Sequence, residues 1–360
     1  MIVDFIIIGQ GIAGTWLSYY LLKEGKSVAV FDKENNQSAS NVASGLINPV
    51  TGRRVVTTWM AEELMPFVWK EYSEAGNFFH AKYIQQKNIL VFPSAPDLQN
   101  AFLERIKEQN NYIQSPGVQK QELHAYFNFP FEVFEISPCY VVDMRKFLDG
   151  YRKYLYQQNL LADEEFDESL INFRDDFIQY KNIKAKKIIY ANGVQASRSK
   201  YWVNLPFVQN KGQALIAEIE GLHTSFTYKF GHLTFISLQQ NLWWIGSNNE
   251  LNFQTTAPTE DFKISTESSL RSILKIPFTI KEHWSSLRPA TVERRPFVGV
   301  HPLYDQIAIL NGMGSKGCSL APWFAKELAE NLVYKKQINP LADVQRFSKM
   351  LSSTERNFDK

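Results

Sequence analysis

The chain has 360 residues, of which 44% are hydrophobic and 21% are charged, as in an ordinary globular protein. This length allows two domains, or one large domain with an inserted lobe. The formal net charge of +2 gives no reason to expect a polyanionic partner, so the composition does not favour a nucleic-acid-binding protein. The aromatic share of 14% predicts side chains that fill cores and line a large pocket, and surface aromatics would also suit a homo-oligomer contact.

Cysteine, histidine and apolar patterns exclude several further classes. Cys139 and Cys318 are far apart in the sequence, and the six histidines show no metal-ligand spacing. We therefore expect no disulfide framework and no metal site. The first apolar run begins at once, without a basic leader or a long apolar span, which predicts a cytoplasmic protein without a membrane span.

The most informative stretch opens the chain. Residues 5–8 form the short apolar run of a strand buried in a parallel sheet, and residues 12–23 form a helical pattern behind them. Gly9 allows a tight turn, Gly11 lets backbone approach a pyrophosphate, and Gly14 lets the helix lie close to the strand. The free N–H groups and positive dipole end of this helix favour phosphate.

A second strand completes this unit. Residues 28–31 are apolar, and Asp32 follows them, where its carboxylate would accept both ribose hydroxyls of a dinucleotide. An acid at this position would repel a 2′-phosphate, so NADPH is disfavoured. This motif by itself leaves FAD and NAD open.

The middle of the chain indicates a separate lobe. Residues 40–49 are small and polar, then apolar, which suits a segment lying against a planar ligand and equally an ordinary surface loop. The remaining patterns predict helices and strands. They are a helix over 59–75, a hairpin over 83–92 centred near 86–88, a helix over 97–109 and a strand within 131–136.

The second half first returns to the parallel sheet. A strand over 140–143 precedes a helix over 144–158 with Asp143 as its N-cap, and residues 187–190 form another buried strand. An antiparallel sheet, a helix and an extended stretch are then expected. The strands cover 211–219, 228–230, 233–238 and 242–247, the helix covers 259–274, and the extended stretch covers 279–288.

The C-terminal part holds a second glycine turn. A buried strand over 307–310 leads into residues 311–317, and a helix follows over 318–333. A glycine loop before a helix N-terminus again suits a negative group or a polar ligand edge. Two such turns near opposite ends of the chain suggest an extended cofactor held at both ends.

Seven short pieces, in order along almost the whole chain, resemble the FAD-dependent D-amino-acid oxidase superfamily, in particular its glycine oxidase and sarcosine oxidase-like branch. They are 9–14 with Asp32, 39–49, 189–193, 211–213, 245–250, 287–291 with 296–299, and 312–317. The resemblance favours FAD over NAD.

The resemblance implies an α/β plus β fold, in which a discontinuous Rossmann-like FAD-binding domain carries a second, mainly antiparallel β substrate lobe. The expected FAD-binding domain comprises residues 1–80, 139–200 and 285–345. The expected substrate lobe comprises 81–138 and 201–284, and 346–360 would be a C-terminal tail.

The resemblance also implies the cofactor site. Pyrophosphate would be held by Gly9, Gly11, Ile12, Ala13 and Gly14, and the adenosine ribose by Asp32. The flavin side would be lined by Ala43, Ser44 and Gly45, the adenine half by Gly193, and the isoalloxazine edge by Gly314, Ser315, Lys316 and Gly317. Further expected cofactor contacts are Lys33, Ser40, Leu46, Gly312 and Met313. Neither cysteine falls where sarcosine oxidases tether the flavin, so non-covalent FAD is expected.

The implied reaction removes a hydride from the carbon bearing a neutral amine to flavin N5, giving an imine that water hydrolyses. Arg288 resembles the anchor of the substrate carboxylate, or else is a structural arginine paired with an acid. Lys316 would stabilise charge growing on the flavin N1–C2=O edge, or else is a surface lysine. No side chain is indicated as a general base.

Two alternatives stay open. Residues 288–302 also resemble an oxidase that acts on a modified tRNA uridine, and a basic face around Arg53, Arg54, Arg294 and Arg295 would favour that function. The other is a flavoprotein subunit without turnover of its own. The amine, its chirality and the electron acceptor, oxygen or another, are not indicated.

Overall fold

The computed structural model describes residues 1–353, which form two compact units. The first comprises residues 1–41, 145–210 and 287–353, and the second comprises 42–144 and 211–286. The expected division differs most at residues 42–80, which the structure assigns to the second unit. The expected tail over 346–360 contains the end of η4 (Val344–Phe347) and the helix α8 (Ser348–Ser352), and residues 354–360 lie outside the described residues.

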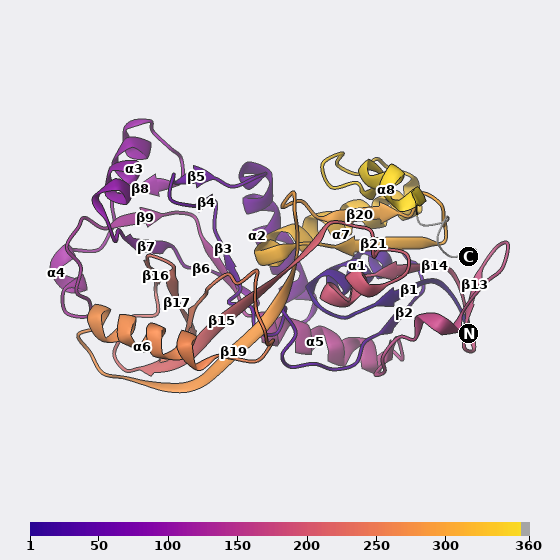
Figure 1. Ribbon diagram of the computed structural model, residues 1–360, viewed down its shortest axis with the longest axis horizontal. Coiled ribbons are helices and arrows are strands. Elements are labelled where there is room, and N and C mark those ends of the chain that lie inside the picture. Colours follow the sequence, from indigo (N-terminus) through magenta and orange to yellow (C-terminus); the bar gives the residue numbers. More distant parts are fainter. Residues whose placement is uncertain (354–360) are drawn as a thin grey trace. The chain divides into compact units, whose positions relative to one another are not determined.

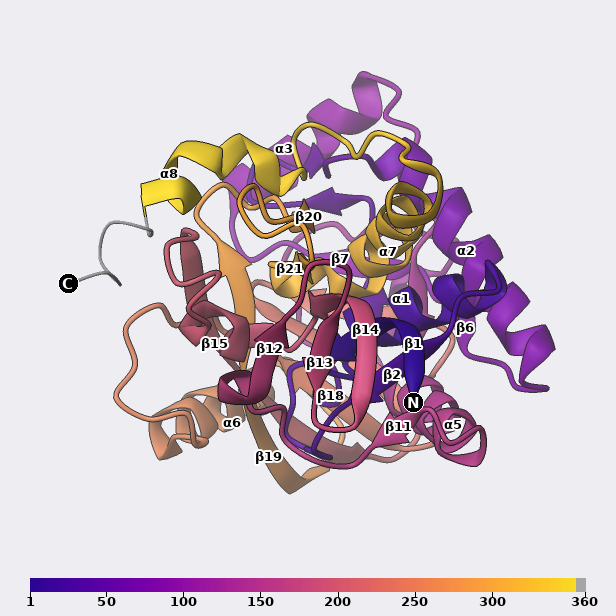
Figure 2. The same cartoon turned by 90° about the vertical axis from the view of Figure 1, so that its right-hand side faces the viewer.

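The first unit is built on a mostly parallel sheet, whose strands stand in a row in Figure 2. At its centre β1 (Ile2–Ile8) pairs in parallel with β2 (Val28–Phe31) and with β14 (Ile183–Tyr190). Beyond β14, β21 (Ile307–Asn311) is also parallel. The predicted return of the chain to this sheet after the middle segment is confirmed. The outer strands are β11 (Leu161–Ala162), β12 (Ile171–Phe173), β13 (Ile178–Tyr180) and β20 (Phe297–Val300).

Three helices of this unit each bury an apolar face. They are α1 (Ile12–Lys23), α5 (Met144–Gln157) and α7 (Gly317–Tyr334). Trp16 of α1 is fully buried and lies 5.2 Å, between ring centroids, from Phe147 of α5. Short 3-10 turns complete the unit: η1 (Glu168–Leu170), η2 (Gly193–Arg198) and η3 (Gly314–Lys316).

The second unit contains a long mixed sheet in the order β19-β15-β18-β17-β16-β7-β9-β8, with the long strands β15 and β19 visible in Figure 1. β17 pairs antiparallel with β16 and β18, whereas β16 pairs in parallel with β7. The bounds are β7 (Ile89–Phe92), β8 (Ile113–Gln114), β9 (Phe134–Ile136), β15 (Phe207–Ile219), β16 (Thr227–Phe230), β17 (Leu233–Gln239), β18 (Leu242–Gly246) and β19 (Phe278–Thr291). The unit boundaries fall inside β15 and β19.

Smaller elements complete the second unit. A three-stranded sheet runs in the order β3-β10-β6, and β4 pairs with β5. The bounds are β3 (Leu46–Ile47), β4 (Val50–Thr51), β5 (Val56–Thr57), β6 (Ile84–Gln86) and β10 (Tyr140–Val142), with helices α2 (Ala61–Phe78), α3 (Pro96–Lys107), α4 (Lys120–Leu123) and α6 (Glu260–Ile273). Among residues 1–353, no helix is long and apolar enough to cross a membrane.

The predicted hairpin over 83–92 is wrong. β6 pairs with β10 and β7 pairs with β9, so the two strands belong to different sheets. The segment between them is tied to residue 139, because the Lys87 N–H donates to the Cys139 carbonyl (2.9 Å). Partners distant in sequence therefore decide the pairing, against the local turn signal.

Candidate functional site

In the turn from β1 into α1, the first and third glycines, Gly9 and Gly14, lie in close contact with each other. Gly9 has φ +96°, a backbone conformation that L side chains rarely adopt. A Cβ on Gly14 would lie 1.8 Å from the Gly9 carbonyl oxygen. No side chain fits at that distance, so α1 can lie this close to the end of β1 only because residue 14 is glycine.

The second glycine lies beside a hydroxyl group. A Cβ on Gly11 would lie 3.1 Å from Ser40 Oγ, and the Ile12 N–H donates to the same oxygen (3.0 Å). The first turn of a helix has N–H groups without acceptors inside the helix, and its dipole favours negative charge. The predicted residues 9–14 and Ser40 thus share one polar site.

The carboxylate of Asp32 lies at the end of β2, beside this turn. Its Oδ1 accepts the Gln10 N–H (2.9 Å), and its Oδ2 accepts a hydrogen bond from Arg152 Nη1 (2.8 Å). Burial raises the pKa of Asp32, while the Gln10 N–H and Arg152 oppose that rise. A surface pocket here is lined by Asp32, Gly11, Lys33 and Arg152 among others, and Lys33 is exposed.

Sequence reasoning missed Gln10 and Arg152. Gln10 is a large polar residue between two motif glycines, and that position could have indicated a role in the site. Arg152 lies on the predicted helix over 144–158, and nothing in the local pattern links it to Asp32. Only the packing of α5 brings the two side chains together.

The C-terminal glycine turn ends beside the first one. A Cβ on Gly317, the first residue of α7, would lie 3.2 Å from Ile12 Cγ2, at the first residue of α1. Gly312 has φ +77° and Gly314 has φ +56°. Two helix N-termini therefore lie side by side, and Met313 and Ser315 belong to the turn that precedes the second.

Gly193 and the end of β19 adjoin this turn. The Gly193 carbonyl accepts a hydrogen bond from Asn311 Nδ2 (2.9 Å), and its own Cβ position faces Pro289. A Cβ on Gly314 would lie 3.6 Å from Ala290 Cβ. Predicted residues from four separate stretches of the chain are thus brought together in the first unit.

The two predicted cationic residues also belong to the first unit. Arg288, two residues before Ala290, donates from Nη1 to Asn210 Oδ1 (3.0 Å), a neutral amide. Lys316 is half-buried, and burial, followed by repulsion from Arg295, lowers its pKa to about 8. A plain surface lysine would keep its usual pKa near 10.4.

Ala43, Ser44, Gly45 and Leu46 belong to the second unit. Gly45 has φ +76°, and its Cβ would lie 1.9 Å from the Val142 carbonyl oxygen. The Gly45 carbonyl accepts the Val142 N–H (2.9 Å), which explains this glycine through the pairing of β3 with β10. Gly45 therefore has a structural role within its own unit, and the predicted contact of the four residues with a flavin stays a prediction.

The four arginines of the tRNA alternative are divided between the units. Arg53 and Arg54 are exposed residues of the second unit, whereas Arg294 and Arg295 belong to the first. Neighbouring Glu293 accepts a hydrogen bond from Arg346 Nε (3.1 Å). Among residues 1–353, no group of three His, Cys, Asp or Glu residues is arranged to hold a metal ion.

A parallel strand, a glycine turn, a helix N-terminus and an acid on the next strand define a dinucleotide-binding protein of the doubly wound class. Within that class the chain belongs to the FAD-dependent oxidoreductase family, because the family model described as "FAD dependent oxidoreductase" matches residues 4–331. FAD fits the residues present: the Cβ-free Gly11 lies at a helix N-terminus, and an acceptor carboxylate lies in the adjoining pocket.

Individual relatives match over nearly their whole length. Glycine oxidase of Bacillus licheniformis is 23% identical over 92% of this chain and 93% of that protein. The crystal structure of glycine oxidase from Geobacillus kaustophilus has a TM-score of 0.78 and 16% identity, covering 95% of this chain and 98% of that chain. L-proline dehydrogenase from P. horikoshii has a TM-score of 0.77 and 17% identity, covering 96% and 98%. The predicted fold class is confirmed.

Proposed function

We propose that this chain oxidises the C–N bond of a small amino acid or related amine. The family match supplies the cofactor and the type of reaction, and the relatives named above act on glycine or proline. When bound, FAD accepts the hydride from the carbon that bears the amine. The electrons then pass to oxygen or to another acceptor.

The observation that carries this proposal is the setting of Arg288. Its guanidinium bonds to the neutral Asn210 amide (3.0 Å), and the two residues that follow it lie beside Gly193 and the C-terminal glycine turn. Arginine binds carboxylates through two parallel N–H donors of its planar guanidinium. We propose that Arg288 anchors the substrate carboxylate and so aims the Cα–H at the ring.

Anaerobic mixing with a panel of amines tests the proposal. Glycine, sarcosine, proline and D-amino acids are each added to the oxygen-free holoprotein while the visible flavin absorbance is followed. We expect at least one amino acid to bleach the flavin. A holoprotein that stays yellow with every amine would instead favour a non-catalytic subunit, and salt-dependent tRNA binding would favour the uridine alternative.

The cysteines support non-covalent FAD and a cytoplasmic location. Cys139 and Cys318 are both free and buried. Burial raises the pKa of both thiols, that of Cys318 to about 12, so neither is a ready nucleophile. Free cysteines suit a reducing compartment.

We also propose that Lys316 stabilises the negative charge that develops on the flavin edge. At pH 7 its ammonium is charged, because the pKa of about 8 lies above that pH. Replacement by methionine, a side chain of similar length, should slow flavin reduction about tenfold, equivalent to about 1.4 kcal/mol. The loss stays this small because the N-terminus of α7 remains in place.

The pH dependence separates Lys316 from the substrate amine. As pH rises through about 8, Lys316 loses its proton and its charge. The parent-to-variant ratio of reduction rates should therefore fall from about ten near pH 7 toward one above about pH 9. Stopped-flow measurements with both proteins check this, and a ratio that does not change with pH would contradict the assignment.

A further inference from the structure

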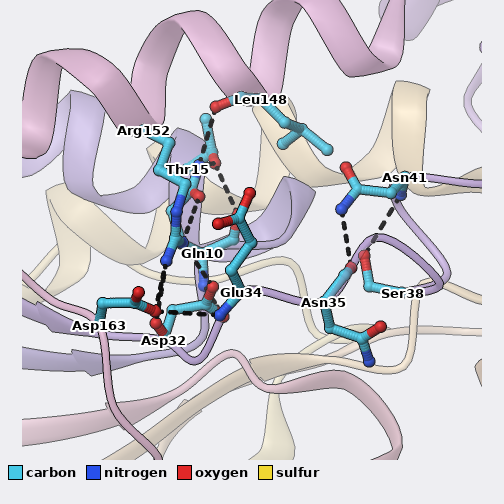
Figure 3. Close-up of polar contacts among 10 residues, drawn as sticks. All are labelled: Gln10, Thr15, Asp32, Glu34, Asn35, Ser38, Asn41, Leu148, Arg152 and Asp163. Atoms are coloured by element: carbon cyan, nitrogen blue, oxygen red, sulfur yellow. Dashed lines mark hydrogen bonds and ion pairs between the residues drawn. The ribbon is translucent and has the colours of Figure 1, made fainter.

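Arg152 is the centre of a polar cluster beside the first glycine turn (Figure 3). Its Nη1 donates to Asp32 Oδ2 (2.8 Å) and to Gln10 Oε1 (3.3 Å). Its Nη2 donates to the Asp32 carbonyl (3.2 Å) and to Asp163 Oδ1 (2.9 Å). The guanidinium therefore contacts both the side chain and the backbone of Asp32.

The Gln10 carboxamide accepts a hydrogen bond from Arg152 and is itself held by two further contacts. Gln10 is buried, and its Nε2 donates to Thr15 Oγ1 (3.0 Å) and to the Leu148 carbonyl (3.3 Å). The carboxamide is thereby oriented with Oε1 toward Arg152. The Gln10 backbone N–H donates to the other oxygen of Asp32 (2.9 Å).

These contacts fix the plane of the Asp32 carboxylate. Within residues 1–353 each oxygen receives one donor, and a carboxylate offers about four acceptor sites in all. About one acceptor site on each oxygen thus remains, and Asp32 lines a pocket together with Gly11 and Arg152. Two hydroxyls on adjacent carbons, the cis-diol of a ribose, match this arrangement.

The two ion pairs of Arg152 differ in exposure. The Asp32 and Arg152 side chains are 23% and 15% exposed, whereas Asp163 is 49% exposed. Exposed ion pairs contribute little because water screens them. The contact with Asp32 is therefore the one that matters energetically.

We propose that Arg152 is a positioning residue that holds Asp32 for the adenosine ribose of FAD. This inference depends on the FAD binding that the family assigns, and it adds a residue on α5 to the nucleoside site. Arg152 acts through the carboxylate: it sets the direction of the acceptor atoms. Removing it should weaken the contact with the ribose diol and leave the flavin end unaffected.

A ligand change combined with a mutation tests this. Protein stripped of flavin is titrated with FAD and with FAD whose adenosine lacks the 2′-hydroxyl, and quenching of flavin fluorescence gives each Kd. The parent should prefer FAD by about tenfold or more, because one hydrogen bond to a charged group contributes about 1.5–3 kcal/mol. Arg152→Ala should bind FAD about tenfold more weakly than the parent does. Its Kd values for FAD and for the 2′-deoxy ligand should differ by about twofold or less.

Two further variants serve as controls. Lys181→Ala removes a cation from an exposed pair with Glu164 in the same unit, and it should keep the parent's preference. Arg152→Lys keeps the charge but loses the planar fork, and it should discriminate less than the parent. If Arg152→Ala is poorly folded, Arg152→Lys gives the answer.

Failure of the role proposed for Arg152 can be distinguished from failure of the proposed amine oxidation. Full discrimination by the folded Arg152 variants would overturn the positioning role, even if an amine reduces the flavin. If no amine reduces the flavin but Arg152→Ala loses its discrimination, the proposed function fails while the role of Arg152 stands.

Discussion

Replacing Gly14 with alanine should destabilise the flavin-free protein by about 1–3 kcal/mol or more and abolish tight FAD binding. The new Cβ would lie 1.8 Å from the Gly9 carbonyl oxygen, which is backbone and cannot rotate away. Helix α1 must therefore move off β1. That movement displaces Ile12, whose N–H donates to Ser40, and Gly11, which lies beside the same hydroxyl. Urea unfolding and fluorescence titration with FAD measure the two effects.

Gly117 supplies the matched control. In the described part of the chain, no heavy atom outside its own neighbourhood lies within 4 Å of its Cβ position, and its φ is not in the left-handed region. Gly117→Ala should change the free energy of unfolding by about 1 kcal/mol or less and leave FAD binding intact. A Gly14→Ala protein with the stability and FAD affinity of the parent would contradict the packing described for this turn.

Replacing Arg288 with alanine should raise the KM for the amino-acid substrate roughly 10²–10³-fold, with a smaller change in kcat. Losing one partner of a hydrogen-bonded charge pair costs about 2–5 kcal/mol, which corresponds to roughly 30- to 4,000-fold and so includes the expected range. The loss falls on binding because the carboxylate contact forms before hydride transfer. Steady-state kinetics and the substrate dependence of anaerobic flavin reduction give both constants.

The control for Arg288→Ala removes a cation that is close in sequence and belongs to the same unit. Arg294 is exposed and lies six residues further along the chain. Arg294→Ala should leave KM within about twofold of the parent, because exposed charges contribute little to a site that they do not contact. If Arg288→Ala binds its substrate like the parent, Arg288 has only a structural role with Asn210.

Some elements could be predicted because their signals are local. The apolar run at β1, the glycines that follow it and the helical period of α1 all lie within the first 23 residues. Each depends on backbone conformation or on one buried face, which neighbouring residues specify. The C-terminal strand, turn and helix were predictable for the same reason.

Pairing between distant segments was less predictable. The strands β6 and β7 are adjacent in sequence and resemble a hairpin, yet they belong to two sheets because β10 and β9 are their partners. The division of the chain shows the same difficulty. Residues 42–80 follow the first glycine turn in sequence but fold with the second unit.

The sequence by itself determined the dinucleotide-binding strand, turn and helix, the acid at position 32 and the family resemblance that the comparisons confirmed. Only the tertiary structure decided that α1 and α7 begin side by side and that Arg152 holds Asp32. The physical reason is the distance along the chain over which each feature is specified. Glycine conformation and strand burial depend on neighbouring residues, whereas a contact between residues 32 and 152 exists only after the sheet and its helices have packed.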